Sequence, residues 1–443
     1  MGRTGKNGGA AASTIPGKKS KKKRHTKMKK SADEEVMKFA GVDNLSSGLF
    51  DLHCHSICSD GHLSPELVVD RAYRNGVRVM ALTDHDTMAG VPDALRAARK
   101  YGMRVIPGIE ISAKYVQRQD AVTKCLGCRQ TGRGGAVTVR EEPVHILAYY
   151  GCCGPSNCEQ LEQKLLEVRE GRYDRAKEMV RKLALLHKPV KWEDVLRIAG
   201  EGVAPGRPHV ARALYEAGHV DSVGQAFTKY LHNNGPAYAT GAELPTAEVV
   251  QLIKETGGVS VLAHPWTLKD PMPVIEHLVE AGINGMEVYR TDGRHAAFGP
   301  LGEVYKLVRV GGSDFHGSGD PDETDLGGID LPSMAVREFL RVAEPLWSSA
   351  VEHILQHFAE GALEGVENDS DQTDAKSLDV WKGDISLSKI SVPGEVEDVQ
   401  CLRLSPWLSE VEKESVEMAA SRLGLKTTTT DVEGHIALGV YKH

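Results

Sequence analysis

The chain has 443 residues, of which 41% are hydrophobic and 26% are charged, and its formal net charge is −7. This balance is typical of a soluble globular protein with room for more than one domain, and the mild charge neither favours nor excludes a nucleic-acid partner. No apolar stretch approaches the roughly 20 residues of a membrane-spanning helix, so no membrane contact is expected, and eight cysteines in so long a chain favour a reducing compartment over a disulfide framework.

Residues 1–46 are expected to be a disordered arm, because they are first rich in Gly and Ala and then in Lys. The cluster KKSKKKRHTKMKK occupies residues 18–30. Such a cluster is typical of a nuclear-import signal or of a tail that contacts nucleic acid, although a solvated arm without a partner has the same composition. We expect the protein in the nucleus or the cytoplasm, with any nucleic-acid contact made through this arm.

From residue 49 onwards, short apolar runs recur, and most are followed by a helical stretch. After the first run, Ser64 and Pro65 favour a helix start and Gly76 favours its end. Strands that alternate with helices indicate an α/β sheet or barrel, and seven strands fit an incomplete version of the eightfold barrel. The seven predicted strands are GLFDLHCH, VRVMALTDHD, RVIPGIEI, VHILAYY, GGVSVLAHP, INGMEVY and LVRVGGSDFHG.

Two stretches interrupt this rhythm, and a third follows it. Residues 116–142 are rich in Gly, Arg and Gln without clear periodicity, which predicts a long surface loop. Residues 159–240 are helical throughout, and a helical insert between barrel strands is expected to cap the barrel. We assign residues 47–345 to the barrel with its cap, residues 346–400 to a helix and an acidic linker, and residues 401–443 to a small α+β appendage.

Polar side chains recur where the predicted strands end, which is where function collects in parallel α/β folds. Six of the 18 histidines are among them. Singly, each has a structural explanation: His145 fits a buried structural histidine and His264, before Pro265, fits a turn. Together they point to a site, because a barrel brings its strand ends to one end. The residues are His53, His55, Asp84, His85, Glu110, His145, His264, Glu287, Asp314 and His316, with Asp60 in the first loop.

Imidazole and carboxylate ligands without cysteine suit Mn, Fe or Zn rather than a thiolate-rich structural zinc site. Even without Asp84 and Glu287, the nine remaining residues are too many ligands for one ion, so we expect two or three divalent ions that share a bridging carboxylate. Such a cluster would attract a phosphate dianion and lower the pKa of a bound water towards about 7. The chemistry that follows is hydrolysis of a phosphate ester.

Weaker features accompany this set. Cys125 and Cys128 form a CxxC, and with Cys152, Cys153 and Cys158 they are compatible with a small zinc site, although the irregular spacing of the later three disfavours it. Arg207 and His209 open a helix after a Pro/Gly-rich segment and are predicted to bind a second phosphate. For Arg172 and Arg175, phosphate contact and a solvated helix face are equally compatible with the sequence.

Six ordered motifs resemble the PHP (polymerase and histidinol phosphatase) domain family. They are DLHCHSICSDG, ALTDHDT, PGIEIS, VHILAYY, LAHP and GGSDFHG, and they span roughly residues 49–345. The cap motifs GRPHVARAL and FTKYLHNNGPAY resemble the branch of nucleoside 3′,5′-bisphosphate phosphatases and 5′-to-3′ exoribonucleases. The resemblance implies a distorted seven-stranded barrel.

The same resemblance implies three metal sites. One would use His53, His55, Glu110 and Asp314, and Glu110 would bridge to a second ion held by His145 and His264. The third would use Asp60, His85 and His316, and the cap would hold a neighbouring phosphate. The appendage resembles a small single-strand nucleic-acid-binding fold, but Lys413 and Glu417 replace the Arg and His of its signature.

The sequence therefore predicts a metal-dependent phosphatase that acts on nucleoside 3′,5′-bisphosphates or on the 5′ ends of short RNA, most simply with manganese. One alternative is a histidinol-phosphate-type phosphatase, against which a cap built for a second phosphate argues. The other is an inactive nucleic-acid-associated factor that uses its basic arm, against which the full ligand set argues.

Overall fold

The computed structural model of the chain describes residues 49–119, 138–290, 295–361, 385–390, 399–406, 408–432 and 435–442. The predicted arm over 1–46 with its basic cluster at 18–30, the CxxC at 125–128 and most of the acidic linker lie outside the described residues. Among the described residues, no helix combines the length and the apolar composition that crossing a bilayer requires.

The seven predicted strands form one curled sheet in the order β1-β2-β3-β4-β6-β7-β8, and the two-residue β5 (Leu244–Pro245) pairs with β3. Strand β4 is antiparallel to both neighbours, while the other pairings along the sheet are parallel. The strands are β1 (Leu49–Asp51), β2 (Val77–Leu82), β3 (Arg104–Gln119), β4 (Thr138–Tyr149), β6 (Val259–Leu262), β7 (Gly285–Glu287) and β8 (Val308–Val310).

Backbone hydrogen bonds join the two edges of this sheet into a barrel-like curl. The segment after β1 pairs with the segment after β8: the N–H of His55 donates to the carbonyl of Phe315 (2.9 Å), and the N–H of Asp314 donates to the carbonyl of His53 (2.9 Å). The predicted α/β seven-stranded barrel is therefore confirmed. Its closure places the residues that follow β1 and β8 side by side.

Helices cover both faces of the sheet. One apolar cluster joins the sheet to α2 (Pro65–Arg74), α3 (Val91–Arg99), α8 (Thr246–Glu255) and α9 (Pro271–Ala281), while α10 (His295–Tyr305) lies between β7 and β8. A second cluster, with Phe339 and Trp347, packs α11 (Ser333–Glu360) against the other face. Helix α2 begins as predicted: the Ser64 hydroxyl caps it by accepting from the N–H of Leu67, and Pro65 follows.

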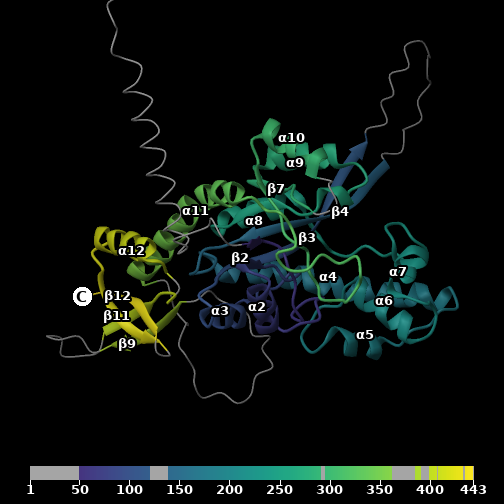
Figure 1. The fold of residues 1–443 in the computed structure, drawn as a ribbon, viewed down its shortest axis with the longest axis horizontal. Helices are drawn as coiled ribbons and strands as arrows, with labels where there is room; N and C mark the ends of the chain where they lie inside the picture. Colours follow the sequence, from purple (N-terminus) through teal and green to yellow (C-terminus); the bar gives the residue numbers. More distant parts are fainter. Residues whose placement is uncertain are drawn as a thin grey trace, which may run out of the picture.

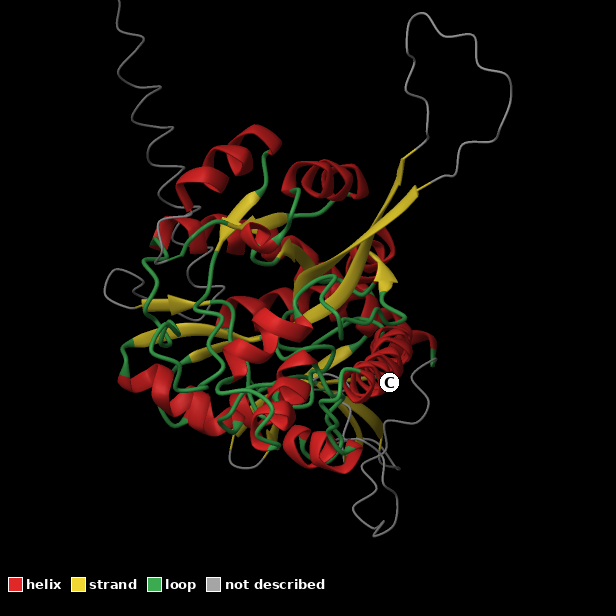
Figure 2. Cartoon of the chain, turned by 90° about the vertical axis from the view of Figure 1, so that its right-hand side faces the viewer, coloured by secondary structure: helices red, strands yellow, loops and turns green. Residues whose placement is uncertain are grey.

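The loop predicted over 116–142 is wrong at both of its ends. Strand β3 continues to Gln119 and β4 starts at Thr138, and the antiparallel ladder runs on through the pair Tyr115 and Glu142 to the pair Gln119 and Thr138. Figures 1 and 2 show these strands projecting from the body as an arm. The sequence does not predict these strand ends, because a two-stranded ribbon that projects into solvent needs no alternating apolar pattern.

A helical segment follows β4 and has its own apolar core, which includes Met179, Val195 and Leu214. It consists of α4 (Cys158–Leu185), α5 (Trp192–Ala199), α6 (Arg207–Glu216), α7 (Val223–Ala226) and a π-helical turn, η2 (Phe227–Leu231). We call residues 158–240 the cap. Figure 1 shows α5, α6 and α7 on one side of the barrel and the C-terminal strands on the opposite side.

The C-terminal module is a four-stranded antiparallel sheet in the order β11-β12-β10-β9, with α12 (Glu410–Arg422) packed on it. Its strands are β9 (Ser386–Ile390), β10 (Val399–Arg403), β11 (Lys426–Val432) and β12 (His435–Tyr441). A salt bridge from Arg104 to Glu412 (3.1 Å) ties α12 to the barrel. Helix α11 runs across residue 345 and β9 lies within 346–400, so the module starts earlier in the chain than residue 401.

Candidate metal centre

All nine predicted ligands gather at one end of the barrel, which we call the mouth. They come from segments that are far apart in the sequence: the ends of β1, β2, β6 and β8, and the middle parts of β3 and β4. His145 differs from the other histidines because β4 runs antiparallel to its neighbours. It pairs with Ser112 of β3 and lies at the mouth, although it is not at the C-terminal end of its strand. The residues are His53, His55, Asp60, His85, Glu110, His145, His264, Asp314 and His316.

Glu110 lies at the centre of this set, and its two carboxylate oxygens face different imidazoles. Oε1 lies 2.8 Å from both His145 Nδ1 and His264 Nε2. Oε2 lies 3.2 Å from His55 Nε2 and 3.4 Å from His53 Nε2. The side chain is 1% exposed. His85 Nδ1 also lies 3.2 Å from Oε2. A carboxylate that presents its two oxygens to different sets of histidines has the geometry of a bridge between two cations.

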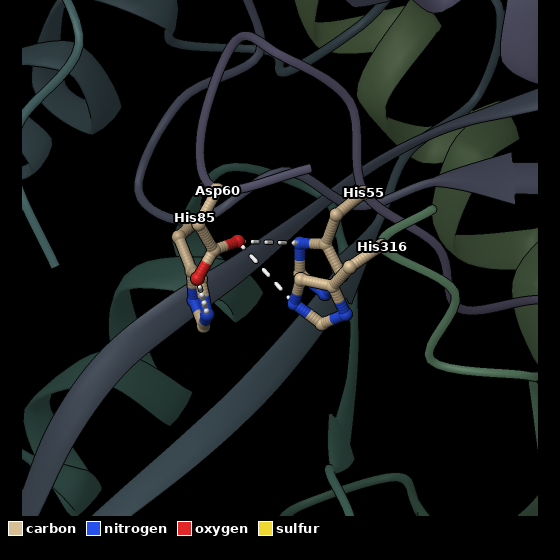
Figure 3. Close-up of side chains that lie close together, drawn as sticks. All are labelled: His55, Asp60, His85 and His316. Carbon is tan, nitrogen blue, oxygen red and sulfur yellow. Dashed lines mark ion pairs between the residues drawn. The ribbon is translucent and has the colours of Figure 1, made fainter. Parts of the chain in front are cut away.

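Asp60 forms a second focus of the cluster. Its Oδ1 lies 3.3 Å from His316 Nε2 and 3.7 Å from His55 Nδ1, and its Oδ2 lies 3.6 Å from His85 Nε2, as Figure 3 shows. Asp314 lies on the other side of His55, with its Oδ1 3.3 Å from His55 Nε2. His55 is thus shared between two groups of ligands.

The donor set fits divalent cations. His53 Nε2 and His55 Nε2 face each other at 3.2 Å, an arrangement in which two neutral imidazoles would direct lone pairs at one point. The Nδ1 atom of His55 is buried without a hydrogen-bond partner among the described residues. Carboxylate oxygens complete each group. Buried imidazole nitrogens and carboxylates that converge in this way are the ligands that Mn, Fe and Zn prefer.

The electrostatics keep the carboxylates ionised. Burial raises the pKa of Glu110, but the imidazoles of His85, His145 and His53 outweigh it and hold that pKa well below its usual value. Asp60 shows the same balance between burial and the imidazoles of His85 and His316. Asp60 in turn raises the pKa of His316 to about 10 against the effect of burial. A cation bound by His316 would therefore compete with the proton of that ring.

Glu287 connects two parts of the site, although the sequence indicates only that it lies at a strand end. Its Oε1 lies 3.1 Å from His53 Nδ1, and its Oε2 accepts the backbone N–H of His264 (2.7 Å). The side chain is 2% exposed. Glu287 therefore orients His53 and fixes the backbone of His264, which is held at φ +29°, a left-handed conformation that is rare for histidine.

Asp84 and Asp86 flank His85 in the sequence, but their carboxylates bind neighbouring loops and strands rather than facing the ligand cluster. Asp84 accepts hydrogen bonds from the backbone and hydroxyl of Ser56 and from the Ser59 hydroxyl (all 2.7 Å), which holds the loop that carries Asp60. Asp86 accepts the N–H of Ser112 (2.6 Å) and pairs with Arg172 Nε (2.5 Å). Alternation along an extended segment places these carboxylates opposite His85.

Arg172 and Arg175 do not lie on a solvated helix face. Arg172 is 5% exposed and donates to Ser112 Oγ (2.7 Å) besides pairing with Asp86. Arg175 pairs with Glu243 (2.6 Å). These contacts join α4 of the cap to β3 and to the loop after β2. Their charges are balanced within the protein.

The two predicted phosphate contacts lie at the start of α6. His209 is 2% exposed, and its Nδ1 accepts the N–H of Gly206 (2.9 Å). Burial lowers the pKa of His209 to about 4, so the ring is neutral and carries its proton on Nε2. Arg207 is half-buried, donates to Asn233 Oδ1 (2.7 Å) and lies 6.0 Å from the ring centre of Tyr238. Both of these partners of Arg207 belong to the cap.

Comparison with known proteins agrees with this geometry. A sequence model of the PHP domain matches residues 51–222. A 5′-3′ exoribonuclease of Haemophilus influenzae is 32% identical over 60% of this chain and 89% of its own length. A 3′,5′-nucleoside bisphosphate phosphatase of Chromobacterium violaceum is 30% identical over 69% of this chain and 98% of its own length.

A solved structure from Bifidobacterium adolescentis, titled as a candidate metal-dependent phosphoesterase, has the same fold. It is 29% identical, superposes with a TM-score of 0.54 and covers 67% of this chain and 96% of that one.

Proposed function

We propose that this chain, which belongs to the PHP domain family and is a metal-dependent phosphoesterase, removes one phosphate from nucleoside 3′,5′-bisphosphates. The observation that carries the proposal is the Glu110-centred cluster, next to which Arg172 of the helical cap contacts Asp86 and Ser112 of the barrel. The cluster would hold the phosphate under attack, and the cap would hold the phosphate beside it.

The metal assignment follows the ligand groups. His53, His55, Asp314 and Glu110 Oε2 would hold one ion, and Glu110 Oε1, His145 and His264 a second. Asp60, His85 and His316 would hold a third, with His55 alongside. Two to three ions are proposed, manganese first, with iron or zinc as alternatives. When bound, they would supply Lewis acidity. This would polarise the phosphoryl oxygens and lower the pKa of water at the site, so that hydroxide is available near neutral pH to attack phosphorus.

The residues of the chain contribute position and charge. Glu287 fixes the ring of His53, and Asp84 fixes the loop of Asp60, so the ligands are held before substrate arrives. Attack transfers a water oxygen to phosphorus, breaks the P–O bond to the nucleoside and leaves a free hydroxyl. His209, with its proton on Nε2, can donate a hydrogen bond to the neighbouring phosphate, and Arg207 is the second proposed contact.

The 5′ end of a short RNA is a second proposed substrate, because it presents the same pair of phosphates on one nucleotide. The Haemophilus influenzae relative carries the name 5′-3′ exoribonuclease. Contact between the arm at 18–30 and nucleic acid, and residence in the nucleus or cytoplasm, stay predictions from the sequence.

The test is phosphate release by the full chain in manganese, with adenosine 3′,5′-bisphosphate, 5′-AMP and histidinol phosphate compared. We expect rapid release from the bisphosphate, loss of that activity in His53→Ala and retention in His353→Ala, which removes an exposed histidine of α11. Faster release from histidinol phosphate would contradict the proposed substrate. No release from any of the three would contradict the proposed function.

A further inference from the structure

The loop that follows the last metal ligand has little apolar packing to hold it in place. Phe315 and Leu326 are buried in the barrel core, but none of residues 316–325, all of which the structure describes, belongs to an apolar cluster. Residues 318–322 are exposed, and Gly317 has a positive φ of 73°. The order of such a segment depends on polar contacts, because fixing the backbone costs roughly 1–2 kcal/mol per residue.

One carboxylate supplies most of these contacts. Glu323 Oε1 accepts the backbone N–H groups of His316 and Gly317, both at 2.8 Å. Its Oε2 accepts the hydroxyl of Ser318 (3.2 Å) and the N–H of Gly319 (3.3 Å). These hydrogen bonds use the lone pairs of both oxygens, so Glu323 supports a predicted metal ligand rather than acting as one.

The chain just beyond Glu323 is anchored to α2. Asp325 forms a bidentate pair with Arg71, at 2.7 and 3.0 Å. The carbonyl of Leu326 accepts a hydrogen bond from the side-chain amide of Asn75 (2.9 Å). Glu323 thus ties the ligand end of the loop to an end that is already fixed to the barrel.

His316 is held so that its Nε2 atom faces the third ligand group. Its Nδ1 lies 2.8 Å from the carbonyl oxygen of Asp314, to which it donates its proton, and its own carbonyl accepts the N–H of His62 (2.7 Å). The Nε2 atom then lies 3.3 Å from Asp60 Oδ1, as Figure 3 shows. Because Glu323 bonds to the backbone of His316 rather than to its ring, it acts on this group through the position of that backbone.

We propose that Glu323 is a positioning residue for the third metal ion, which it serves by holding the backbone of His316 where the ring reaches the Asp60 group. Without Glu323, binding of the ion would have to order the loop, and the affinity would fall by that cost. The inference rests on the metal centre of the proposed function. It concerns one ligand group alone, because the ligands around Glu110 are oriented by Glu287.

The test is manganese binding to the metal-depleted full chain, measured by calorimetry without substrate. His316→Ala identifies the ion that depends on this ligand. Glu323→Ala should weaken binding of that ion about tenfold to a hundredfold, the range for residues that support metal ligands, and leave the other ions unchanged. Glu323→Gln should weaken it about fivefold, because its carbonyl oxygen can still accept the N–H groups of His316 and Gly317 but without the charge.

A double variant separates positioning of His316 from a general loss of structure. When Glu323→Ala is added to His316→Ala, the affinities of the remaining ions should not change further, because the two residues act on the same ion. Asp322→Ala is the matched control, since it removes an exposed carboxylate from the same loop, and it should bind manganese as the wild type does.

Unchanged affinities in both Glu323 variants, or equal weakening of all ions, would overturn the inference. A further loss in the double variant would also overturn it, as would a wild-type chain in which no ion depends on His316. Failure of the wild-type chain to hydrolyse the bisphosphate would instead overturn the proposed function and leave the metal-binding comparison intact.

Discussion

Replacement of Glu287 by Gln should weaken the metal centre without unfolding the barrel. Gln has the same shape, and its one carbonyl oxygen can still accept the N–H of His264, where Glu287 now lies 2.7 Å away. Its NH2 group then faces His53 Nδ1, which lies 3.1 Å from the Glu287 carboxylate and carries the proton when Nε2 faces the metal, so the charge-assisted hydrogen bond to His53 is lost. Hydrogen bonds to charged groups contribute about 1.5–3 kcal/mol, so the metal-bound state differs by at least about 1.5 kcal/mol. That difference is about a tenfold loss of metal affinity, at the lower end of the range for such outer partners.

The assay is phosphate release as a function of manganese concentration. We expect the half-activating concentration of Glu287→Gln to rise about tenfold and the activity to recover at excess metal. Glu280→Gln, which removes the same charge from an exposed position on α9, is the control and should match the wild type. An unchanged half-activating concentration in Glu287→Gln would refute the reasoning that Glu287 acts through His53.

Three further outcomes are expected. Arg172→Met should lower the free energy of unfolding, measured in urea, by about 3–5 kcal/mol, because it leaves the fully buried Asp86 without its ion pair. The double variant Arg172→Met with Asp86→Asn should recover much of that stability, and losses that simply add would contradict the pairing. Gly312→Ala should lower the melting temperature and abolish metal binding, since a Cβ there would overlap the backbone nitrogen of His53; a native-like melting curve with full metal binding would contradict this packing. Metal binding at about pH 8 should release protons. Asp60 outweighs the effect of burial and raises the pKa of His316 to about 10, so the ring is protonated at about pH 8 and must lose its proton to bind a metal ion. Calorimetry in two buffers of different ionisation enthalpy measures this release, and equal heats in both buffers would contradict it.

Much of the metal centre could be predicted from the sequence because its residues follow from local pattern. His53 and His55 alternate at the end of a strand, and Asp314 and His316 do the same after β8. The curl of the sheet then brings these two segments together through direct backbone hydrogen bonds. That these residues bind metal stays a prediction; that they lie within contact of Glu110 and Asp60 is a property of the fold.

Other features depend on contacts that no local pattern encodes. The reversal of β4 follows from its direct connection to β3, and it decides that His145 faces the mouth from the middle of a strand. The support roles of Asp86 and Glu287 depend on partners 86 residues away at Arg172 and 234 residues away at His53.

The measurement that tests the account most directly is the number of metal ions bound per chain, determined together with phosphate release as manganese is added to metal-depleted protein. The account predicts that two to three ions bind and that activity on adenosine 3′,5′-bisphosphate rises with them. Glu110→Gln should lose both the additional ions and the activity, because no other carboxylate faces both pairs of histidines among the described residues. Full activity with a single bound ion, or undiminished metal content in Glu110→Gln, would contradict the central claim that Glu110 bridges a cluster of cations.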